Sequence, residues 1–420
     1  MSSVATRVAG SERRSLVVVL PATSYRGERF TQAAARLGVD LVLATDLPAA
    51  FARLDCRALR VDFTDPALAA QQVLDATTGR CDGALGTDEI TALIAALIAE
   101  RLGLPNNNPL GVRAARDKLL LRQLLAEAGI PQPAIRSIDP GENDGNFCSA
   151  FPCVVKPTML TGSQGVIRAD TPSELRAAIS RVRAILERHP SASRADPDFF
   201  RLLVEEYIEG DEISVDALVT GVEFEMLAVF DKPDPLRGPF FEETLYVTPS
   251  RHSEPVLRDA IDVTGRAARA LGLSHGAIHA ELRIGSDGAR LIEIAARSIG
   301  GLCSRALDLV TGNLEELLIA HAVGIALAPM EASGAAGVMM IPIGRGGVLK
   351  SASGIEGARS VPGVVDVAIT IRPGEAVRPL PEGSSYLGFI FAQGELAVDV
   401  ERALRAAHAR LEFSWKPLLS

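Results

Sequence analysis

The chain has 420 residues, of which 47% are hydrophobic, and its formal net charge is −9 at pH 7. This length is enough for about three domains, and the composition is typical of a globular α/β protein. Because the net charge is negative and charges of both signs are interspersed, neither a nucleic acid nor an anionic membrane is expected as the main partner.

Cysteine usage and hydropathy predict a cytoplasmic protein with no membrane partner. The longest apolar runs, such as residues 16–20, are much shorter than a membrane-spanning helix. No C-x-x-C pair is present, which argues against a disulfide framework and against a zinc site. The five cysteines are Cys56, Cys81, Cys148, Cys153 and Cys303.

Strand-like and helix-like segments alternate over the first hundred residues. Strands are predicted over residues 16–20, 40–44, 58–63 and 82–86, and helices over 28–37, 66–76 and 89–102. This alternation predicts a parallel, doubly wound sheet, in which ligands bind beyond the carboxyl ends of the strands. Polar residues at those ends are either ligand contacts or helix caps: Ser24, Arg26, Asp88 and Glu89.

The rest of the chain is less regular. Helices are predicted over residues 113–128 and 173–188, and strands over 151–156 and 202–207. From Pro329 onward Gly and Pro become frequent, and this composition predicts a separate C-terminal α+β domain. Its predicted elements are strands over residues 338–342, 365–371 and 387–392 and a helix over 399–411.

Lys156 lies in the apolar strand Cys153–Pro157, where a lysine is costly unless its ammonium group meets an anion or extends to solvent. In the loop that follows, Gly162 and Gly165 allow the backbone to approach phosphates closely. Together they predict a nucleotide whose phosphates lie under a flexible flap. Neither the Walker A spacing nor a G-x-G-x-x-G after the first strand is present, which disfavours P-loop and dinucleotide-binding folds.

The acidic segment 204–212 permits two interpretations. A strand that leaves its sheet at Glu206–Ile208 can offer backbone groups to an adenine edge, and Glu212 can accept hydrogen bonds from both ribose hydroxyls. Taken in isolation, the segment is better interpreted as an acidic surface turn.

Two glutamates are predicted to face each other on one β-hairpin. A three-residue loop over 286–288 pairs Gly285 with Ala289 and thereby places Glu281 opposite Glu293. Their carboxylates then point to the same face and repel each other unless a cation lies between them. Two carboxylates together with ligand phosphates are the usual protein site for Mg²⁺.

The alternative is a solvated hairpin face. The other strand positions are apolar, and His279 and Arg297 flank the carboxylates, which favours a functional site.

Taken in order, these segments resemble the ATP-grasp superfamily of ATP-dependent carboxylate–amine ligases. The resemblance extends over most of the chain and is carried by Gly86–Glu89, Leu102–Asn106, Asp117-Lys118 with Arg122, Ala128–Pro133, Val155–Pro157, Gly162–Gly165, Glu205–Glu212, Glu281, Glu293 and Arg297. It implies an ATP-grasp fold with an N-terminal Rossmann-like domain over residues 1–112. A two-lobed ATP-grasp domain is implied over 113–330, with lobes at about 134–207 and 208–330, and a small α+β domain over 331–420.

The resemblance also implies roles for individual residues. ATP phosphates are implied to contact Lys118 and Lys156 beneath the flap Gly162, Ser163, Gln164 and Gly165. Adenine is placed at Glu205, Glu206 and Ile208, and the ribose at Glu212. Mg²⁺, for which Mn²⁺ can substitute, is placed at Glu281 and Glu293.

One departure from the superfamily concerns the metal site. The family commonly shows E-x-N, with Asn as a further metal ligand, but here Glu293 is followed by Ile and Ala295. Either fewer protein groups hold the ions, or the chain is a non-catalytic, ATP-binding regulatory protein.

The stretch from Glu293 to Arg297, followed by small residues, is similar to the bacterial L-amino-acid ligases, which join amino acids into dipeptides. The segments 240–243, 276–281 and 346–364 resemble that branch as well. In that branch, the Arg matching Arg297 is implied to contact the transferring phosphate and the substrate carboxylate, with Gly300 and Gly301 beside it. An acid matching Glu242 or Glu243 is implied to bind a substrate amino group.

We therefore expect an ATP-dependent ligase that forms an amide through an acyl phosphate, with Arg297 and His279 as catalytic residues. Its partners would be small-molecule carboxylate and amine substrates, such as amino acids, and family analogy suggests a homodimer. A rival is a purine-biosynthesis or biotin-carboxylase type of enzyme. A phosphate-bearing substrate would need extra cations, for which the candidates are Lys232, Arg237, Arg251 and Arg305. An amino-acid-sized apolar pocket is suggested instead by Phe240, Phe241, Leu245 and Tyr246.

Overall fold

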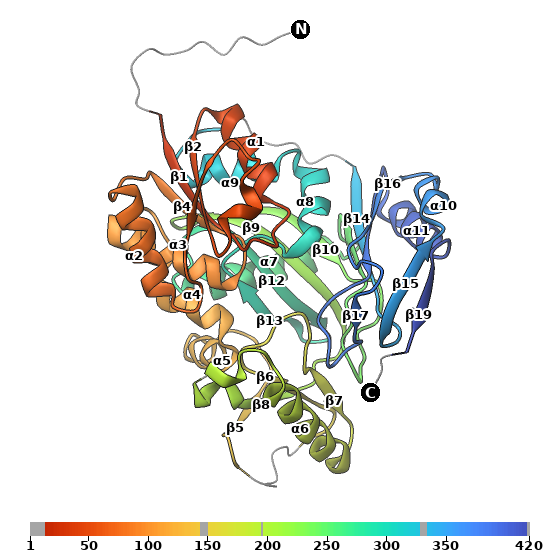
Figure 1. Cartoon of the computed structure of the whole chain (residues 1–420). Coiled ribbons are helices and arrows are strands. Elements are labelled where there is room, and N and C mark those ends of the chain that lie inside the picture. The colour runs from red at the N-terminus through yellow and green to blue at the C-terminus, as the bar shows by residue number, and fades with distance from the viewer. Residues whose placement is uncertain (1–12, 143–149, 195, 328–333, 418–420) are drawn as a thin grey trace. The chain divides into compact units, whose positions relative to one another are not determined.

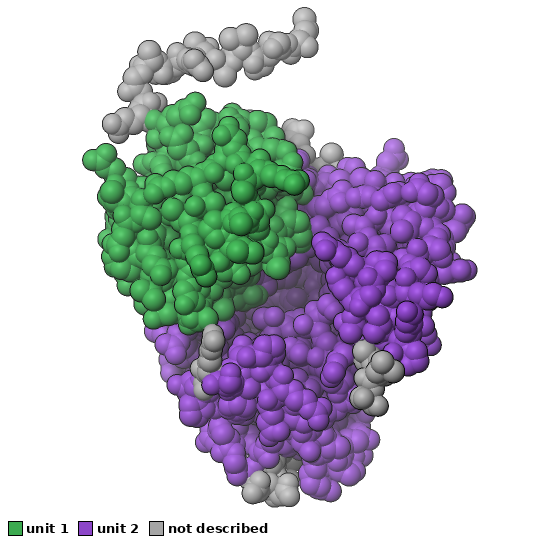
Figure 2. Space-filling view, in the orientation of Figure 1, with its two compact units in different colours: residues 1–109, 313–329 green, residues 110–312, 330–420 purple. Residues whose placement is uncertain are grey.

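The structure is a computed structural model that describes residues 13–142, 150–194, 196–327 and 334–417 (Figure 1). It divides into two compact units, which Figure 2 colours separately. The first unit comprises Met1–Pro109 and Asn313–Pro329, and the second comprises Leu110–Gly312 and Met330–Ser420. The predicted domain borders stay predictions, and the border between residues 330 and 331 lies outside the described residues. Cys148 also lies outside them.

The first unit is built on a parallel sheet with the strand order β3-β2-β1-β4. Its strands are β1 (Ser15–Val19), β2 (Asp40–Thr45), β3 (Arg57–Arg60) and β4 (Gly83–Gly86). Its helices are α1 (Gly27–Leu37), η1 (Pro48–Phe51), α2 (Pro66–Thr77), α3 (Glu89–Leu102) and, from later in the chain, α9 (Leu314–Ala322). The predicted doubly wound pattern is confirmed, although the third strand ends at Arg60. Asp88 is a helix cap, because its carboxylate accepts the Thr91 N–H at the start of α3.

The single helix predicted over residues 113–128 is wrong. The structure has two helices, α4 (Pro109–Arg116) and α5 (Lys118–Glu127), separated at Asp117. The Asp117 carboxylate accepts the backbone N–H groups of the first turn of α5, so it starts a new helix there. Lys118 and Arg122 still lie one turn apart on α5, and both are buried.

A four-stranded antiparallel sheet follows, with the order β5-β8-β6-β7. Its strands are β5 (Ile135–Ile138), β6 (Cys153–Pro157), β7 (Ile167–Ala169) and β8 (Leu202–Glu206). The amphipathic helix α6 (Pro172–Glu187) buries Leu175, Ile179 and Val182 against it. Two short 3₁₀ turns complete this part, η2 (Ala192–Arg194) and η3 (Pro197–Phe200).

The central element of the second unit is an eight-stranded sheet with the order β13-β12-β9-β10-β11-β14-β18-β16. Strands β9 to β13 come from the middle of the chain: β9 (Asp211–Thr220), β10 (Glu223–Asp231), β11 (Leu245–Thr248), β12 (His275–Gly285) and β13 (Gly288–Ala295). The C-terminal strands β14 (Ala335–Ile341), β16 (Val364–Ile369) and β18 (Gly388–Gly394) continue the same sheet. The C-terminal segment therefore shares its main sheet with the middle of the chain.

The helices of this unit are α7 (Glu254–Ala270), η4 (Gly301–Cys303), α8 (Ser304–Thr311), α10 (Ile355–Arg359) and α11 (Ala397–His408). A small sheet is formed by β17 (Ala376–Val377), β15 (Gly347–Ser353) and β19 (Glu412–Lys416). Among the described residues, no helix combines the length and the hydropathy needed to cross a lipid bilayer.

The hairpin of β12 and β13 pairs Glu281 with Glu293, as predicted, but by a different register. The predicted three-residue loop is wrong, because Gly285 pairs with Gly288 and leaves a two-residue loop. The register then shifts between Leu282, which pairs with Leu291, and Glu281. Ile292 is thereby left as an extra residue on β13, and Glu293 lies opposite Glu281.

Two helical glycines should respond oppositely to substitution by alanine. A Cβ atom on Gly111 of α4 would lie 1.7 Å from the Leu271 carbonyl oxygen, whereas one on Gly357 of α10 would have its nearest neighbour, in the Arg410 side chain, at 4.0 Å. We expect Gly111→Ala to lower the free energy of unfolding by about 1–3 kcal/mol through overpacking. Gly357→Ala should be neutral or stabilising by up to ~1 kcal/mol, because alanine favours helix. Urea unfolding of both variants tests this, and equal stability of the two would contradict it.

Candidate active site

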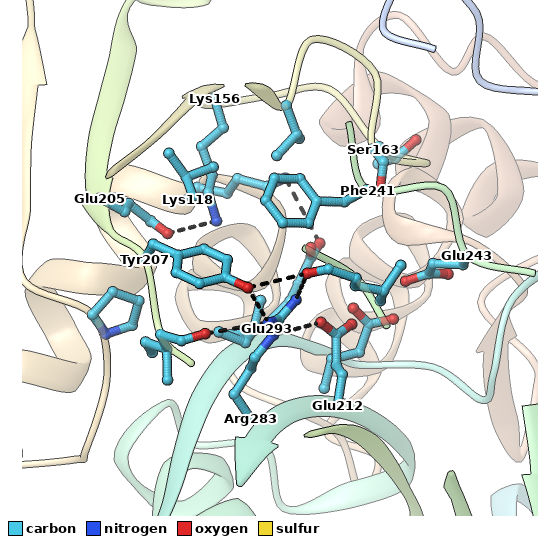
Figure 3. A pocket seen from close by; sticks show the side chains of 18 of the residues that line it. Lys118, Lys156, Ser163, Glu205, Tyr207, Glu212, Phe241, Glu243, Arg283 and Glu293 are labelled. Carbon is cyan, nitrogen blue, oxygen red and sulfur yellow. Dashed lines mark hydrogen bonds and ion pairs between the residues drawn. The ribbon is translucent and has the colours of Figure 1, made fainter. Parts of the chain in front are cut away.

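A cavity in the second unit brings together most of the predicted ligand-binding residues (Figure 3). Its walls come from the four-stranded sheet, the loop after β6, and strands β9, β12 and β13. Predicted residues that line it are Lys118, Lys156, Gly162, Ser163, Glu205, Glu206, Ile208, Glu212, Glu243, Glu281 and Glu293. Several other lining residues were given no role from the sequence, among them Tyr207, Leu236 and Arg283, because no local pattern distinguishes them.

Glu205 of β8 is a buried anchor for two cations. Its carboxylate accepts the Arg122 Nε and Nη2 donors at 2.9 and 3.3 Å, and the Lys156 ammonium lies 2.5 Å from its Oε2. Burial alone would raise the pKa of Glu205, but Arg122 and Lys156 lower it to about 2. Burial also lowers the pKa of Lys156, an effect that Glu205 opposes. The predicted role of Glu205 at an adenine stays a prediction.

Arg122 extends this anchor to the hairpin that carries Glu293. Its Nη2 donates to the carbonyl oxygen of Ile292 at 2.7 Å, and its Nη1 donates to that of Leu291 at 3.4 Å. Ile292 is the extra residue of β13, so the guanidinium group binds the hairpin where its register shifts. One arginine thus ties β8 to the backbone next to Glu293.

Lys118 and Lys156 give the cavity two ammonium groups. Lys118 is the first residue of α5, and its Nζ donates to the Leu160 carbonyl oxygen at 2.8 Å. The same atom lies 3.7 Å from Oε1 of Glu293. Figure 3 shows Lys156 joined to Glu205, with Glu212 and Arg283 across the cavity. Two partly neutralised ammonium groups beside a glycine-bearing loop suit a polyphosphate.

A second cluster of charges surrounds the buried Lys232, which directly follows β10. Its Nζ lies 2.7, 2.6 and 3.2 Å from the carboxylates of Glu212, Glu243 and Glu281, respectively. Burial by itself would lower the pKa of Lys232, but the three carboxylates raise it well above its usual value. Lys232 is therefore a cation held inside the protein, and the proposal that it binds a substrate phosphate receives no support from this position.

The glutamates around Lys232 also accept hydrogen bonds from other side chains. Burial and the neighbouring Glu281 raise the pKa of Glu243, whose carboxylate accepts the Tyr246 hydroxyl at 2.8 Å. Glu212 also accepts Arg283 Nε at 3.0 Å, so both of its oxygens have cationic donors. Its predicted contact with a ribose stays a prediction.

His279 lies between two carboxylates. Its Nδ1 is 3.1 Å from Asp216, and its Nε2 is 3.4 Å from Glu281. Burial alone would lower the pKa of His279, but Asp216 and Glu281 raise it to about 9, so the ring is cationic at neutral pH. Asp216 also accepts the Ile299 N–H at 3.0 Å and thereby fixes the segment that follows Arg297.

Arg297, Gly300 and Gly301 form a turn after β13. The Arg297 Nη1 donates to the Ser298 carbonyl oxygen at 2.9 Å, and a Cβ atom on Gly300 would lie 3.3 Å from this nitrogen. Gly301 has a φ of +57°, which favours glycine. None of these three, nor His279, is among the residues that line the cavity, and their catalytic and substrate roles stay predictions.

The remaining predicted residues make contacts with other parts of the protein. Glu206 pairs with Arg290 at 2.9 Å, and Glu242 accepts the Ile343 N–H at 3.1 Å. Gln164 and Gly165 of the flap are bonded to residues near 382 and are not among the cavity-lining residues.

Glu281 and Glu293 are the predicted ligands of a divalent cation that ligand oxygens would also bind, and this role stays a prediction. They occupy paired positions of the hairpin, and both line the cavity that holds the two lysines. Ala295 pairs with His279 and offers no side-chain ligand atom, so a metal at this hairpin would be held by the two carboxylates alone. Carboxylates combined with phosphate oxygens are the usual ligands of Mg²⁺.

Comparison with known families agrees with this architecture. Residues 149–306 match the family model of the ATP-grasp domain, and residues 339–416 match that of the L-amino acid ligase C-terminal domain 2. The chain contains an ATP-grasp domain. The predicted family and fold are thereby confirmed.

Solved structures and curated proteins that are similar to this chain include two ligases and a synthase. The crystal structure of an L-amino acid ligase from Bacillus licheniformis superimposes with a TM-score of 0.83 at 24% identity, covering 97% of this chain and all of that one. Alanine–anticapsin ligase of Bacillus subtilis is 29% identical over 48% of this chain and 45% of its own length. Human carnosine synthase 1 is 28% identical over 68% of this chain and 36% of its own. The chain thus spans less than half the length of these two relatives.

Adjacent glutamates on β8 provide a test of the buried anchor. Glu205→Ala would leave Arg122 and Lys156 buried without their carboxylate, so we expect a loss of about 3–5 kcal/mol in the free energy of unfolding. Glu206→Ala removes a half-exposed pair with Arg290 and should cost under ~1 kcal/mol. Chemical denaturation measures the free energy of unfolding of both variants. A similar loss in the two would show that Glu205 stabilises the protein no more than an exposed ion pair does.

Proposed function

We propose that the chain is an ATP-dependent ligase that joins the carboxylate of an L-amino acid to the amine of a second amino acid or another amine. The observation that carries the proposal is one cavity that combines Lys118 and Lys156 with the paired carboxylates Glu281 and Glu293. Cations for phosphates and carboxylates for a metal are what phosphoryl transfer from ATP requires.

In the first step, an oxygen of the substrate carboxylate attacks the γ-phosphorus of ATP. A new O–P bond forms, the bond to the ADP oxygen breaks, and an acyl phosphate results. Lys118 and Lys156 stabilise the negative charge on the phosphates, which is mainly a matter of position and electrostatics. When bound, Mg²⁺ would be held by Glu281 and Glu293 and would neutralise further phosphate charge.

In the second step, the amine nitrogen attacks the acyl carbon and phosphate leaves with the electron pair of the C–O bond. The amine loses a proton, and an amide remains. We assign to the cationic His279 and to Arg297 the stabilisation of the transferring phosphate and the orientation of the substrate carboxylate. The flap Gly162–Gly165 would keep water from hydrolysing the acyl phosphate.

The described contacts disfavour a phosphate-bearing substrate. Of the four candidate cations, three are held by carboxylates: Lys232 by three glutamates, Arg251 by Asp231 and Arg305 by Asp366. The fourth, Arg237, lines a different cavity from the one that holds Lys118 and Lys156. Of the apolar candidates, Phe241 lines the cavity, whereas Phe240 packs against the core of the four-stranded sheet and α6. Tyr246 and Leu245 are buried in β11. An amino-acid-sized substrate next to Phe241 fits this distribution better.

Three finer points belong to the same proposal. Mn²⁺ would support the reaction in place of Mg²⁺, because both are bound by carboxylate oxygens. The active form would be a homodimer. The enzyme would work in the cytoplasm, because five cysteines without a C-x-x-C pair are compatible with a reducing compartment.

Screening pairs of amino acids for ADP release, with mass spectrometry of the products, tests the function. In a pair that the wild type joins, Glu293→Gln should lower the rate by about 100-fold or more, because a charged metal ligand is lost from the reacting phosphates. The exposed Glu223→Gln serves as a matched control and should keep the wild-type rate. Undiminished turnover in Glu293→Gln, with its fold intact by circular dichroism, would remove the metal assignment.

A further inference from the structure

The flap is bound by a turn from the C-terminal part of the chain. The Gly165 N–H donates to the Pro381 carbonyl oxygen at 2.9 Å, and the Gln164 side-chain amide donates to that of Glu382 at 2.8 Å. At Gly162, a Cβ atom would lie 3.3 Å from the Ser384 carbonyl oxygen. Residues 381–384, here called the clasp turn, therefore contact the flap along its length.

The flap needs such support because its backbone is unusual. Gly162, Ser163 and Gly165 have φ values of +62°, +56° and +73°. Glycine adopts this left-handed region freely, but for Ser163 it is unfavourable and persists only where neighbouring contacts fix it. Gly162 and Ser163 line the cavity, so the conformation that the clasp turn supports is the one that faces the nucleotide site.

The clasp turn is itself tightly closed and lies close to a strand of the main sheet. The Gly383 N–H donates to the Pro379 carbonyl oxygen at 2.9 Å, and a Cβ atom on Gly383 would lie 1.9 Å from the Arg378 carbonyl oxygen. A few residues later, β18 enters the eight-stranded sheet at Gly388. The turn is therefore closed tightly and fixed to the main sheet of the unit.

Glu382 also joins the clasp turn to helix α6. Its carboxylate accepts Nε and Nη2 of Arg181 at 2.7 and 3.0 Å, a two-pronged ion pair. The Arg181 guanidinium group lies over the Phe240 ring, 5.0 Å from its centroid. The hydrogen bond from Arg181 holds the pKa of Glu382 below its usual value. A planar, charge-assisted pair of this kind fixes orientation as well as distance.

We infer that Glu382 is a positioning residue for the ligase reaction: with Arg181, it holds the clasp turn against α6 and so keeps the flap closed over the ATP phosphates. This inference rests on the proposed function. It assigns to the C-terminal domain a part in shielding the acyl phosphate, although Glu382 and the flap are separated by more than two hundred residues of sequence. A flap that opens too readily would admit water, and ATP would then be consumed without amide formation.

The test compares Glu382→Ala, Arg181→Ala and the double variant with the wild type, using an amino-acid pair that the wild type joins. The KM for ATP and the ratio of ADP released to amide formed are measured. We expect both quantities to rise about three- to ten-fold in each single variant, which is the scale of losing one partly exposed, two-pronged pair. The double variant should be no worse than either single variant, because both residues act through the same pair.

The charge-reversed pair Arg181→Glu with Glu382→Arg should restore part of the coupling. A matched control is Glu356→Ala, which breaks another carboxylate–arginine pair of the C-terminal segment, with Arg359 at 2.9 Å, away from the flap. It should leave the ratio and the KM unchanged. Wild-type values of both quantities in Glu382→Ala would overturn the inference, as would a lowered melting temperature with unchanged coupling.

Failure of the proposed function looks different. In that case the wild type releases no ADP with any pair of amino acids. Calorimetric titration with ATP then still tests the role of the clasp turn, because it measures the affinity for ATP. Glu382→Ala should weaken this affinity about three- to ten-fold. Equal affinity of the two proteins would overturn the inference by itself.

Discussion

The candidate site depends on one buried carboxylate. Glu205 binds Arg122 and Lys156 at once, and Arg122 in turn binds the carbonyl oxygens beside Glu293. A buried cation without its partner is costly, so these groups hold one another in a single arrangement. Through this chain of contacts, a strand of the four-stranded sheet is linked to the hairpin of the eight-stranded sheet. Lys156 and Glu293, to which we assign the phosphates and the metal, are thereby placed in the same cavity.

Local signals in the sequence were sufficient for the first sheet and for part of the site. The alternation of apolar strands and helices predicted the first sheet, and the spacing of Lys118 and Arg122 predicted that they share a helix face. Glu281 and Glu293 were predicted to be partners, yet the loop was wrong. An extra residue at Ile292 compensates for the shorter loop, and such a register shift leaves no mark in a single sequence.

Contacts between distant segments could not be predicted in the same way. Nothing near Lys232 in the sequence indicates that three glutamates, from β9, β12 and the loop before β11, surround it. The C-terminal strands were predicted, but their place in the sheet of the middle segment depends on strand order, which periodicity does not report. The break at Asp117 was missed because the apolar pattern continues across it, although Asp is a common helix cap.

The central claim is that an acyl phosphate forms in this cavity. It is tested most directly by following oxygen from a substrate acid labelled with ¹⁸O in its carboxylate. If the carboxylate attacks the γ-phosphorus, amide formation transfers one labelled oxygen to the released inorganic phosphate, which mass spectrometry detects. Unlabelled phosphate, or release of AMP and pyrophosphate in place of ADP, would contradict the account.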